Sequence, residues 1–153
     1  KLVELLTPVV NLAKESDIML VVETGNNAMI TSCFLGRKLI DDLDTKHLKV
    51  LWDPANALYC GENPSKNALD SMEGGYLGHV HMKDVEVAIH QAKIKCVALG
   101  EGQMAPHLQK ISERLNQIGY DGSMSLESVY RPTEGNFEDG FNASITKFKN
   151  LYS

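Results

Sequence analysis

Short apolar runs alternate with longer amphipathic segments along the whole chain, and this alternation restricts the fold more than any other feature. Four runs have the length and residue types of strands, at 18–23, 47–52, 77–84 and 123–127. Apolar residues recur at helical spacing in a first segment that ends near residue 15 and again in about 34–43, 106–118 and 137–151. Asn63-Pro64-Ser65, typical of a helix cap followed by proline in the first turn, predicts a helix at 63–73, and 94–99 is a further short strand candidate. A helix followed by four strand–helix pairs is typical of an α/β fold with a parallel sheet, either doubly wound or a barrel.

Size and composition set limits on the class of protein. With 153 residues the chain is long enough for one hydrophobic core and too short for two ordinary domains. The net charge of -5, without a cluster of basic residues, gives no support to nucleic-acid binding. No apolar stretch approaches the length of a membrane span. The chain starts at Lys1 with an apolar pattern already under way at Leu2, so we expect it to be cut from something longer.

The cysteines and glycines exclude several common sites. Cys33, Cys60 and Cys96 are far apart and odd in number, which suggests neither a disulfide framework nor a zinc–thiolate site, and a reducing cytoplasm is the default location. Neither a G-x-G-x-x-G nor a P-loop motif occurs, which disfavours the phosphate-binding versions of an open sheet.

Four strand-like runs end in a side chain that can bind a metal. These residues are Glu23, Asp53, His81 and Glu127. Because the C-terminal ends of parallel strands face one site, the four groups could converge although they are far apart in sequence. Three carboxylates and one imidazole suit Mn²⁺ or Mg²⁺ best, with Co²⁺ or Zn²⁺ as alternatives. The competing interpretation is four unrelated polar residues at strand ends.

The run 77–84 carries two histidines two positions apart. In a regular strand His79 and His81 project to one face, while Gly78 and Val80 point to the other. Taken alone, this pattern is also typical of a half-exposed strand with solvated or hydrogen-bonded histidines.

Several short motifs, taken together, resemble the xylose-isomerase-like TIM-barrel family of sugar phosphate isomerases and epimerases. They are Val22-Glu-Thr-Gly25, Trp52-Asp-Pro-Ala-Asn56, His79-Val-His-Met-Lys-Asp84, Leu99-Gly-Glu-Gly102 and Gly119-Tyr-Asp-Gly122 leading to Ser125-Leu-Glu127. The resemblance implies that residues 1–153 form the C-terminal half of a (β/α) barrel, about four βα units that correspond to strands five to eight. It also implies that the metal ligands are Glu23, Asp53, His81 and Glu127.

The resemblance further implies a divalent-metal-dependent isomerase or epimerase. It would act on a sugar or sugar phosphate by proton transfer through a metal-bound enediolate, with Glu23 and Glu127 as base and acid. Two alternatives remain open: an incomplete, non-catalytic half-barrel, and a metal-dependent lyase of the inosose dehydratase type or an endonuclease-type hydrolase. Since a full barrel takes about 250 residues, the expected partner is a missing N-terminal half or a second copy of the chain.

The remaining site residues are assigned with the same resemblance. Asn56 stands where many family members have a histidine that contacts substrate or metal, which weakens the endonuclease interpretation. Lys83 and Arg131, in loops beyond the strand ends, could hold substrate oxygens or a phosphate. His79 is expected to support the site rather than to bind the metal. Trp52 is expected to point away from the site into the core.

Overall fold

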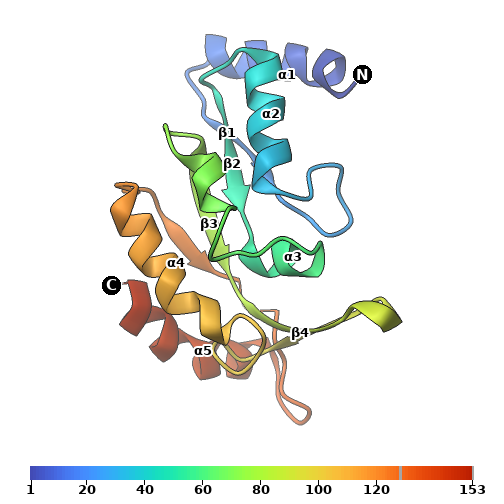
Figure 1. Ribbon diagram of the computed structural model, residues 1–153, viewed down its shortest axis with the longest axis vertical. Coiled ribbons are helices and arrows are strands. Elements are labelled where there is room, and N and C mark those ends of the chain that lie inside the picture. Colours follow the sequence, from blue (N-terminus) through green and yellow to red (C-terminus); the bar gives the residue numbers. More distant parts are fainter. Residues whose placement is uncertain (128, 153) are drawn as a thin grey trace.

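The computed structural model describes residues 1–127 and 129–152, and its main sheet has four parallel strands (Figure 1). These are β1 (Leu20–Glu23), β2 (Leu48–Trp52), β3 (Leu77–Met82) and β6 (Met124–Leu126), in the spatial order β1-β2-β3-β6. All three strand pairs are parallel. The prediction of an α/β fold with a parallel sheet is therefore confirmed.

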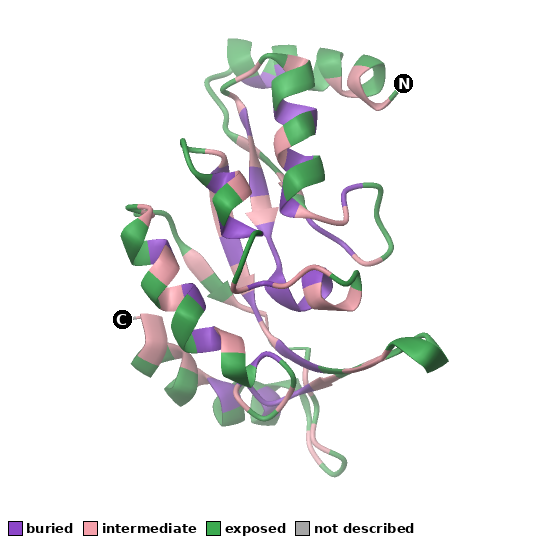
Figure 2. Ribbon diagram, in the orientation of Figure 1, coloured by how far each residue is buried: buried purple, intermediate pink, exposed green. Residues whose placement is uncertain are grey.

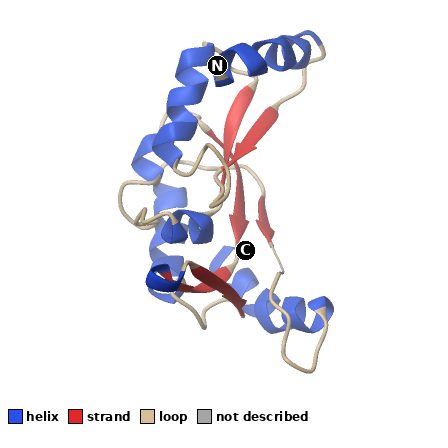
Figure 3. Cartoon of the chain, turned by 90° about the vertical axis from the view of Figure 1, so that its right-hand side faces the viewer, coloured by secondary structure: helices blue, strands red, loops and turns tan. Residues whose placement is uncertain are grey.

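Helices cover one face of this sheet. They are α1 (Leu2–Glu15), α2 (Cys33–Leu43), α3 (Pro54–Tyr59), α4 (Ala105–Gln117) and α5 (Phe137–Tyr152). Val50 and Trp52 of β2 and Val80 and Met82 of β3 are fully buried and join one core with Leu108 of α4. Figure 2 shows the buried residues concentrated along the strands and the inner sides of the helices, and Figure 3 shows the helices mainly along one side of the strands. No helix in the described part of the chain is both long and apolar enough to cross a membrane.

The second face of the sheet is open at β1. Leu20 and Val22 are half-buried, whereas Val21 and Glu23 are exposed. The run at 18–23 is apolar without alternation, a pattern that predicts a strand covered on both faces, and for β1 that prediction is wrong. Alternation along the strand sends every second side chain away from the helices, and no described element packs over Val21, which is 43% exposed.

The chain forms a helix directly after β2, where the sequence had predicted one further on, at 63–73. Asp53 accepts hydrogen bonds from the backbone N–H groups of Ala55 and Asn56, and Pro54 stands in the first turn of α3. The predicted helix is reduced to one 3₁₀ turn, η1 (Leu69–Met72). Asn63, expected as its cap, accepts instead from Ser65 two residues away, in a local turn.

A two-stranded antiparallel hairpin separates β3 from α4. Its strands are β4 (Asp84–Ala88) and β5 (Lys93–Val97), joined by the short 3₁₀ turn η2 (Ile89–Gln91). The sequence had placed residue 84 at the end of the histidine strand and a short strand at 94–99. The structure instead ends β3 at Met82, and Figure 1 shows the hairpin extending sideways from the sheet.

A β-bulge interrupts the alternation of β3. Val50 pairs with Leu77 but the next residue, Leu51, pairs with His79. A Cβ atom on Gly78 would lie 2.7 Å from Lys49 Cβ, so Gly78 points to the face that carries Lys49 and the histidines. The sequence had put Gly78 on the opposite face, and the extra residue of the bulge is the reason that this prediction is wrong.

Candidate metal centre

Three carboxylates and one histidine converge at the C-terminal ends of the four parallel strands. Glu23 is the last residue of β1, Asp53 follows β2, His81 is the penultimate residue of β3, and Glu127 follows β6. One ligand-type atom from each of the four lies within 4.8 Å of the others. His81 Nδ1 is 3.4 Å from Glu23 Oε1 and 3.8 Å from Glu127 Oε2. The parallel register thus brings together the four side chains that the sequence had singled out.

Asp53 is the most deeply placed of the four. Its side chain is fully buried, and Oδ1 is used up in capping α3. Its own backbone N–H donates to Thr24 Oγ1 over 3.0 Å, which ties the end of β2 to the end of β1. Burial raises the pKa of Asp53 to about 6, although the charge of Lys83 opposes this shift. Only Oδ2 therefore remains to face a ligand.

Two buried atoms of this cluster are suited to a metal. Among the described residues, His81 Nδ1 is buried without a hydrogen bond, and the buried Asp53 Oδ2 has the Lys83 ammonium, 2.6 Å away, as its ion-pair partner. A buried polar atom without a hydrogen bond costs free energy, and a cation bound by His81 Nδ1 and Asp53 Oδ2 would supply the interaction that the histidine lacks. Together with Glu23 and Glu127 they offer three oxygens and one nitrogen, a donor set that fits Mn²⁺, Mg²⁺ or Zn²⁺.

Lys83 enters the same cluster. Its Nζ lies 2.6 Å from Asp53 Oδ2 and 2.6 Å from Glu127 Oε2, and its side chain is only 11% exposed. Burial alone would lower the pKa of Lys83, but the two carboxylates outweigh burial and raise it, so the amine stays protonated. Burial likewise favours a higher pKa for Glu127, and Lys83 reverses this to a lowered pKa. The sequence predicts that Lys83, beyond the end of β3, holds substrate oxygens. The structure turns its side chain toward Asp53 and Glu127, and substrate binding by Lys83 stays a prediction.

His79 lies beside His81 but is held by two serines. Its Nδ1 is 3.1 Å from Ser123 Oγ and its Nε2 is 2.9 Å from Ser125 Oγ. The rings of the two histidines meet edge to face with centroids 5.3 Å apart. Burial and the neighbouring His81 lower the pKa of His79, which favours its neutral form. Both ring nitrogens have partners, and this supports the predicted positioning role, which stays a prediction.

The other two predicted substrate contacts have different surroundings. Asn56 is buried, and its Nδ2 donates to the backbone oxygen of Thr24 over 3.1 Å, so this amide joins the loops after β1 and β2. Arg131 is exposed in the loop after β6 and forms no ion pair with any residue that the structure describes. Substrate binding by both residues stays a prediction.

Sequence reasoning did not single out two buried residues that shape the site, Thr24 and Asp84. Thr24 links Asp53 and Asn56 as described above. Asp84, fully buried, accepts four backbone N–H groups, from Val85, Gly100, Gly102 and Met104, at 2.7 to 3.0 Å. A usable signal was present, because an aspartate at a strand end and a later Gly-x-Gly turn supply matching acceptor and donors.

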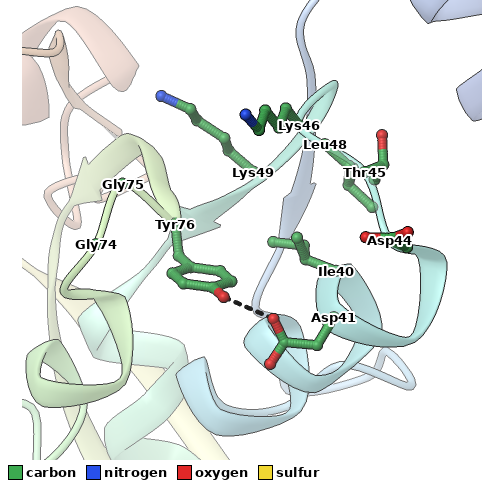
Figure 4. Close-up of a pocket in the computed structure, with 10 residues that line it drawn as sticks. All are labelled: Ile40, Asp41, Asp44, Thr45, Lys46, Leu48, Lys49, Gly74, Gly75 and Tyr76. Carbon is green, nitrogen blue, oxygen red and sulfur yellow. Dashed lines mark hydrogen bonds between the residues drawn. The ribbon is translucent and has the colours of Figure 1, made fainter.

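A cavity of about 530 Å³ lies at the other end of the sheet. It is lined by residues from the end of α2, the start of β2 and the loop before β3, and the hydroxyl of Tyr76 donates to Asp41 across it over 2.6 Å (Figure 4). Lys49 and Lys46 stand at its rim in the same view. None of the predicted site residues lines this cavity, so the candidate centre is the cluster at the C-terminal strand ends.

The fold and this cluster define a class: α/β proteins with a carboxylate-rich, metal-competent centre at the C-terminal ends of parallel strands. The chain belongs to the xylose isomerase-like TIM barrel family, whose model matches residues 1–150. A search among curated proteins gave no match.

Solved structures of the same fold cover almost all of the chain. The probable 3-DHS dehydratase AsbF of Bacillus anthracis matches with a TM-score of 0.77 and 18% identity, over 97% of this chain and 55% of its own. The 3-keto-D-glucoside 4-epimerase YcjR of E. coli matches with a TM-score of 0.75 and 20% identity, over 97% and 52%. IolI, in a structure with a bound zinc atom, matches with a TM-score of 0.75 and 15% identity, over 97% and 54%. The chain therefore spans about half the length of the structures that it matches.

Proposed function

We propose that the chain is the metal-binding half of a sugar or sugar phosphate isomerase or epimerase that depends on a divalent cation. The observation that carries the proposal is the convergence of Glu23, Asp53, His81 and Glu127 within 4.8 Å. Among the described residues, His81 Nδ1 is buried without a hydrogen bond, and Asp53 Oδ2 is held by the cationic Lys83. The family match and the epimerase among the similar structures support it.

The exposure of the carboxylates indicates which of them can only bind the metal and which can also contact a substrate. Asp53 is fully buried and can only hold the cation, whereas the side chains of Glu23 and Glu127 are 44% and 31% exposed. A ligand above the strand ends can therefore touch both glutamates. A bound divalent cation would supply positive charge next to a carbonyl and make its α-proton more acidic. One glutamate then removes that proton and the other returns a proton, to the same carbon in an epimerase or to its neighbour in an isomerase.

A dehydratase is the second candidate, favoured by the likeness to AsbF. It would use the same first proton transfer, but the electron pair would then expel a hydroxyl group on the adjacent carbon. Glu127 or Lys83 could protonate that leaving group, since the two side chains are in contact over 2.6 Å within the cluster. The endonuclease-type alternative is weaker, because the amide of Asn56 stands where a further histidine would be needed.

Metal binding is the first test. Mn²⁺ should bind to the wild-type chain, and Asp53→Asn should abolish binding, as measured by titration calorimetry. Asn can still cap α3, so circular dichroism should show an intact fold. Wild-type protein that binds neither Mn²⁺ nor Mg²⁺ nor Zn²⁺ would overturn the proposal.

Turnover is the second test. Ketoses, their phosphates and inososes are incubated with the protein and Mn²⁺, and the products are separated by chromatography. Glu127→Gln should lower any turnover found by at least about a thousandfold, because it removes the acid–base function. The exposed Glu134→Gln is the matched control and should leave turnover unchanged. Near-normal activity of Glu127→Gln would contradict the assigned role.

A further inference from the structure

The ammonium group of Lys83 contacts two of the carboxylate oxygens that would bind a metal. Asp53 has one oxygen left after capping α3, and that oxygen, Oδ2, is the one that Lys83 contacts at 2.6 Å. Glu127 presents Oε2 to Lys83 at the same distance, and the same oxygen lies 3.8 Å from His81 Nδ1. Lys83 thus shares its two partners with the candidate metal.

A metal cation and the Lys83 ammonium would repel each other if both were bound to these two oxygens. A divalent metal held at about 2.1 Å from both oxygens would lie within about 5 Å of an ammonium held at 2.6 Å. The metal would carry twice the charge, and Glu23 and His81 would hold it as well, whereas the described ion pairs of Lys83 are with Asp53 and Glu127. Lys83 is the partner that can move, because its flexible four-carbon side chain starts between β3 and β4 and no strand needs to shift.

We infer that Lys83 is a built-in counter-ion that is displaced when the metal enters, an inference that rests on the proposed function. Without metal, its charge offsets the repulsion among three clustered carboxylates. With metal, Lys83 leaves Asp53 and Glu127, and its ammonium becomes available on the substrate side of the centre. Lys83 therefore contacts substrate oxygens only in metal-loaded protein, which reconciles its sequence-based role with its position among the carboxylates.

The displacement can be followed by the chemical accessibility of Lys83. The full chain is acetylated briefly with acetic anhydride, with and without saturating Mn²⁺, and the modified lysines are quantified by mass spectrometry. Lys83 should be labelled at least fivefold faster with Mn²⁺, while the exposed Lys95 of the hairpin serves as reference and should not change. In Asp53→Asn, Mn²⁺ should leave the labelling of Lys83 unchanged.

Metal affinity provides the second measurement. Lys83→Met should bind Mn²⁺ at least tenfold more tightly than wild type in titration calorimetry, whereas Lys83→Arg, which keeps the charge, should stay within threefold. Lys83→Met also removes the long-range repulsion between the lysine charge and the metal, and this loss alone could tighten binding. The labelling therefore decides whether Lys83 moves. Mn²⁺ binding without a change in Lys83 labelling, or with equal or weaker affinity of Lys83→Met, would overturn the displacement. Absence of Mn²⁺ binding in every form would overturn the proposed function itself.

Discussion

At the scale of single residues, two buried aspartates show the difference between a structural and a functional carboxylate. Both carboxylate oxygens of Asp84 accept hydrogen bonds, from four backbone N–H groups in all. In Asp53, by contrast, one oxygen caps a helix and the other faces the metal-competent cluster. From the sequence both are aspartates near a strand end. The residue type and the strand-end position made the ligand chemistry predictable. The later Gly-x-Gly turn was a signal for the anchoring role of Asp84, but which N–H groups it binds depends on a loop up to twenty residues away.

Asp84→Asn should destabilise the fold. The amide has one acceptor oxygen in place of two and turns donor hydrogens toward backbone N–H groups. The free energy of unfolding should fall by about 2–4 kcal/mol, because charge-assisted hydrogen bonds in a fully buried site are lost. Urea denaturation checks this. Asp42→Asn, which removes an exposed ion pair with Lys38, is the control and should cost at most about 0.5 kcal/mol. Equal effects of the two variants would contradict the anchoring role.

His79→Ala should weaken metal binding more than it weakens the fold. His79 contacts the edge of His81 and is itself held by Ser123 and Ser125, so its loss frees the ligand ring to reorient. The affinity for Mn²⁺ should fall by about tenfold or more, as measured by titration calorimetry. His90→Ala, at the exposed tip of the hairpin, should leave the affinity unchanged. An unchanged affinity for Mn²⁺ in His79→Ala would contradict the positioning role of His79.

At the scale of elements, the strands of the main sheet were predictable and the segments between them were not. Hydrophobic runs fixed all four parallel strands to within a few residues. The helix at 54–59 was missed because Asp53 acts both as a strand end and as a helix cap, and because Pro54, which stops a strand, can also stand in the first turn of a helix. The hairpin was only half predicted. Its first strand alternates Val85 and Val87 with polar residues, but Asp84 had been assigned to the preceding strand.

Gly78→Ala should disturb three strands at once. A Cβ atom there would lie 2.7 Å from Lys49 Cβ on β2 and 3.0 Å from Val21 Cγ1 on β1. Pushing β3 outward should cost about 1–3 kcal/mol of unfolding free energy, and it should also weaken Mn²⁺ binding by moving His81 away from Asp53. Thermal denaturation and metal titration measure the two effects. A variant with wild-type stability and affinity would show that the bulge has room for a side chain.

At the scale of the whole molecule, the chain presents a sheet with two open edges. Strand β1 pairs only with β2, and β6 pairs only with β3, among the described residues. Exposed apolar side chains gather on the helices next to these edge strands in sequence, namely Leu5, Val9 and Leu12 of α1 and Phe137 and Phe141 of α5. Open parallel edges and apolar helix faces of this kind favour association. The sequence could predict a barrel-type sheet from four βα units, but contacts beyond the chain decide how its edges are covered.

We expect the two edges to be covered by four further βα units of the same architecture, supplied by a companion half or by a second copy. The corresponding prediction is that the isolated chain associates or exposes apolar surface. Light scattering at several concentrations should show a dimer if a second copy closes the barrel, with β1 of each chain beside β6 of the other. Replacement of Leu5 and Val9 by Glu should then shift the dimer to monomer, while Lys14→Glu on the same helix should not.

A monomer that binds a hydrophobic dye would exclude the second copy and favour the companion half. A monomer that binds no such dye would contradict the expectation, because it would mean that the edges and the apolar faces of α1 and α5 are stable in water without any partner.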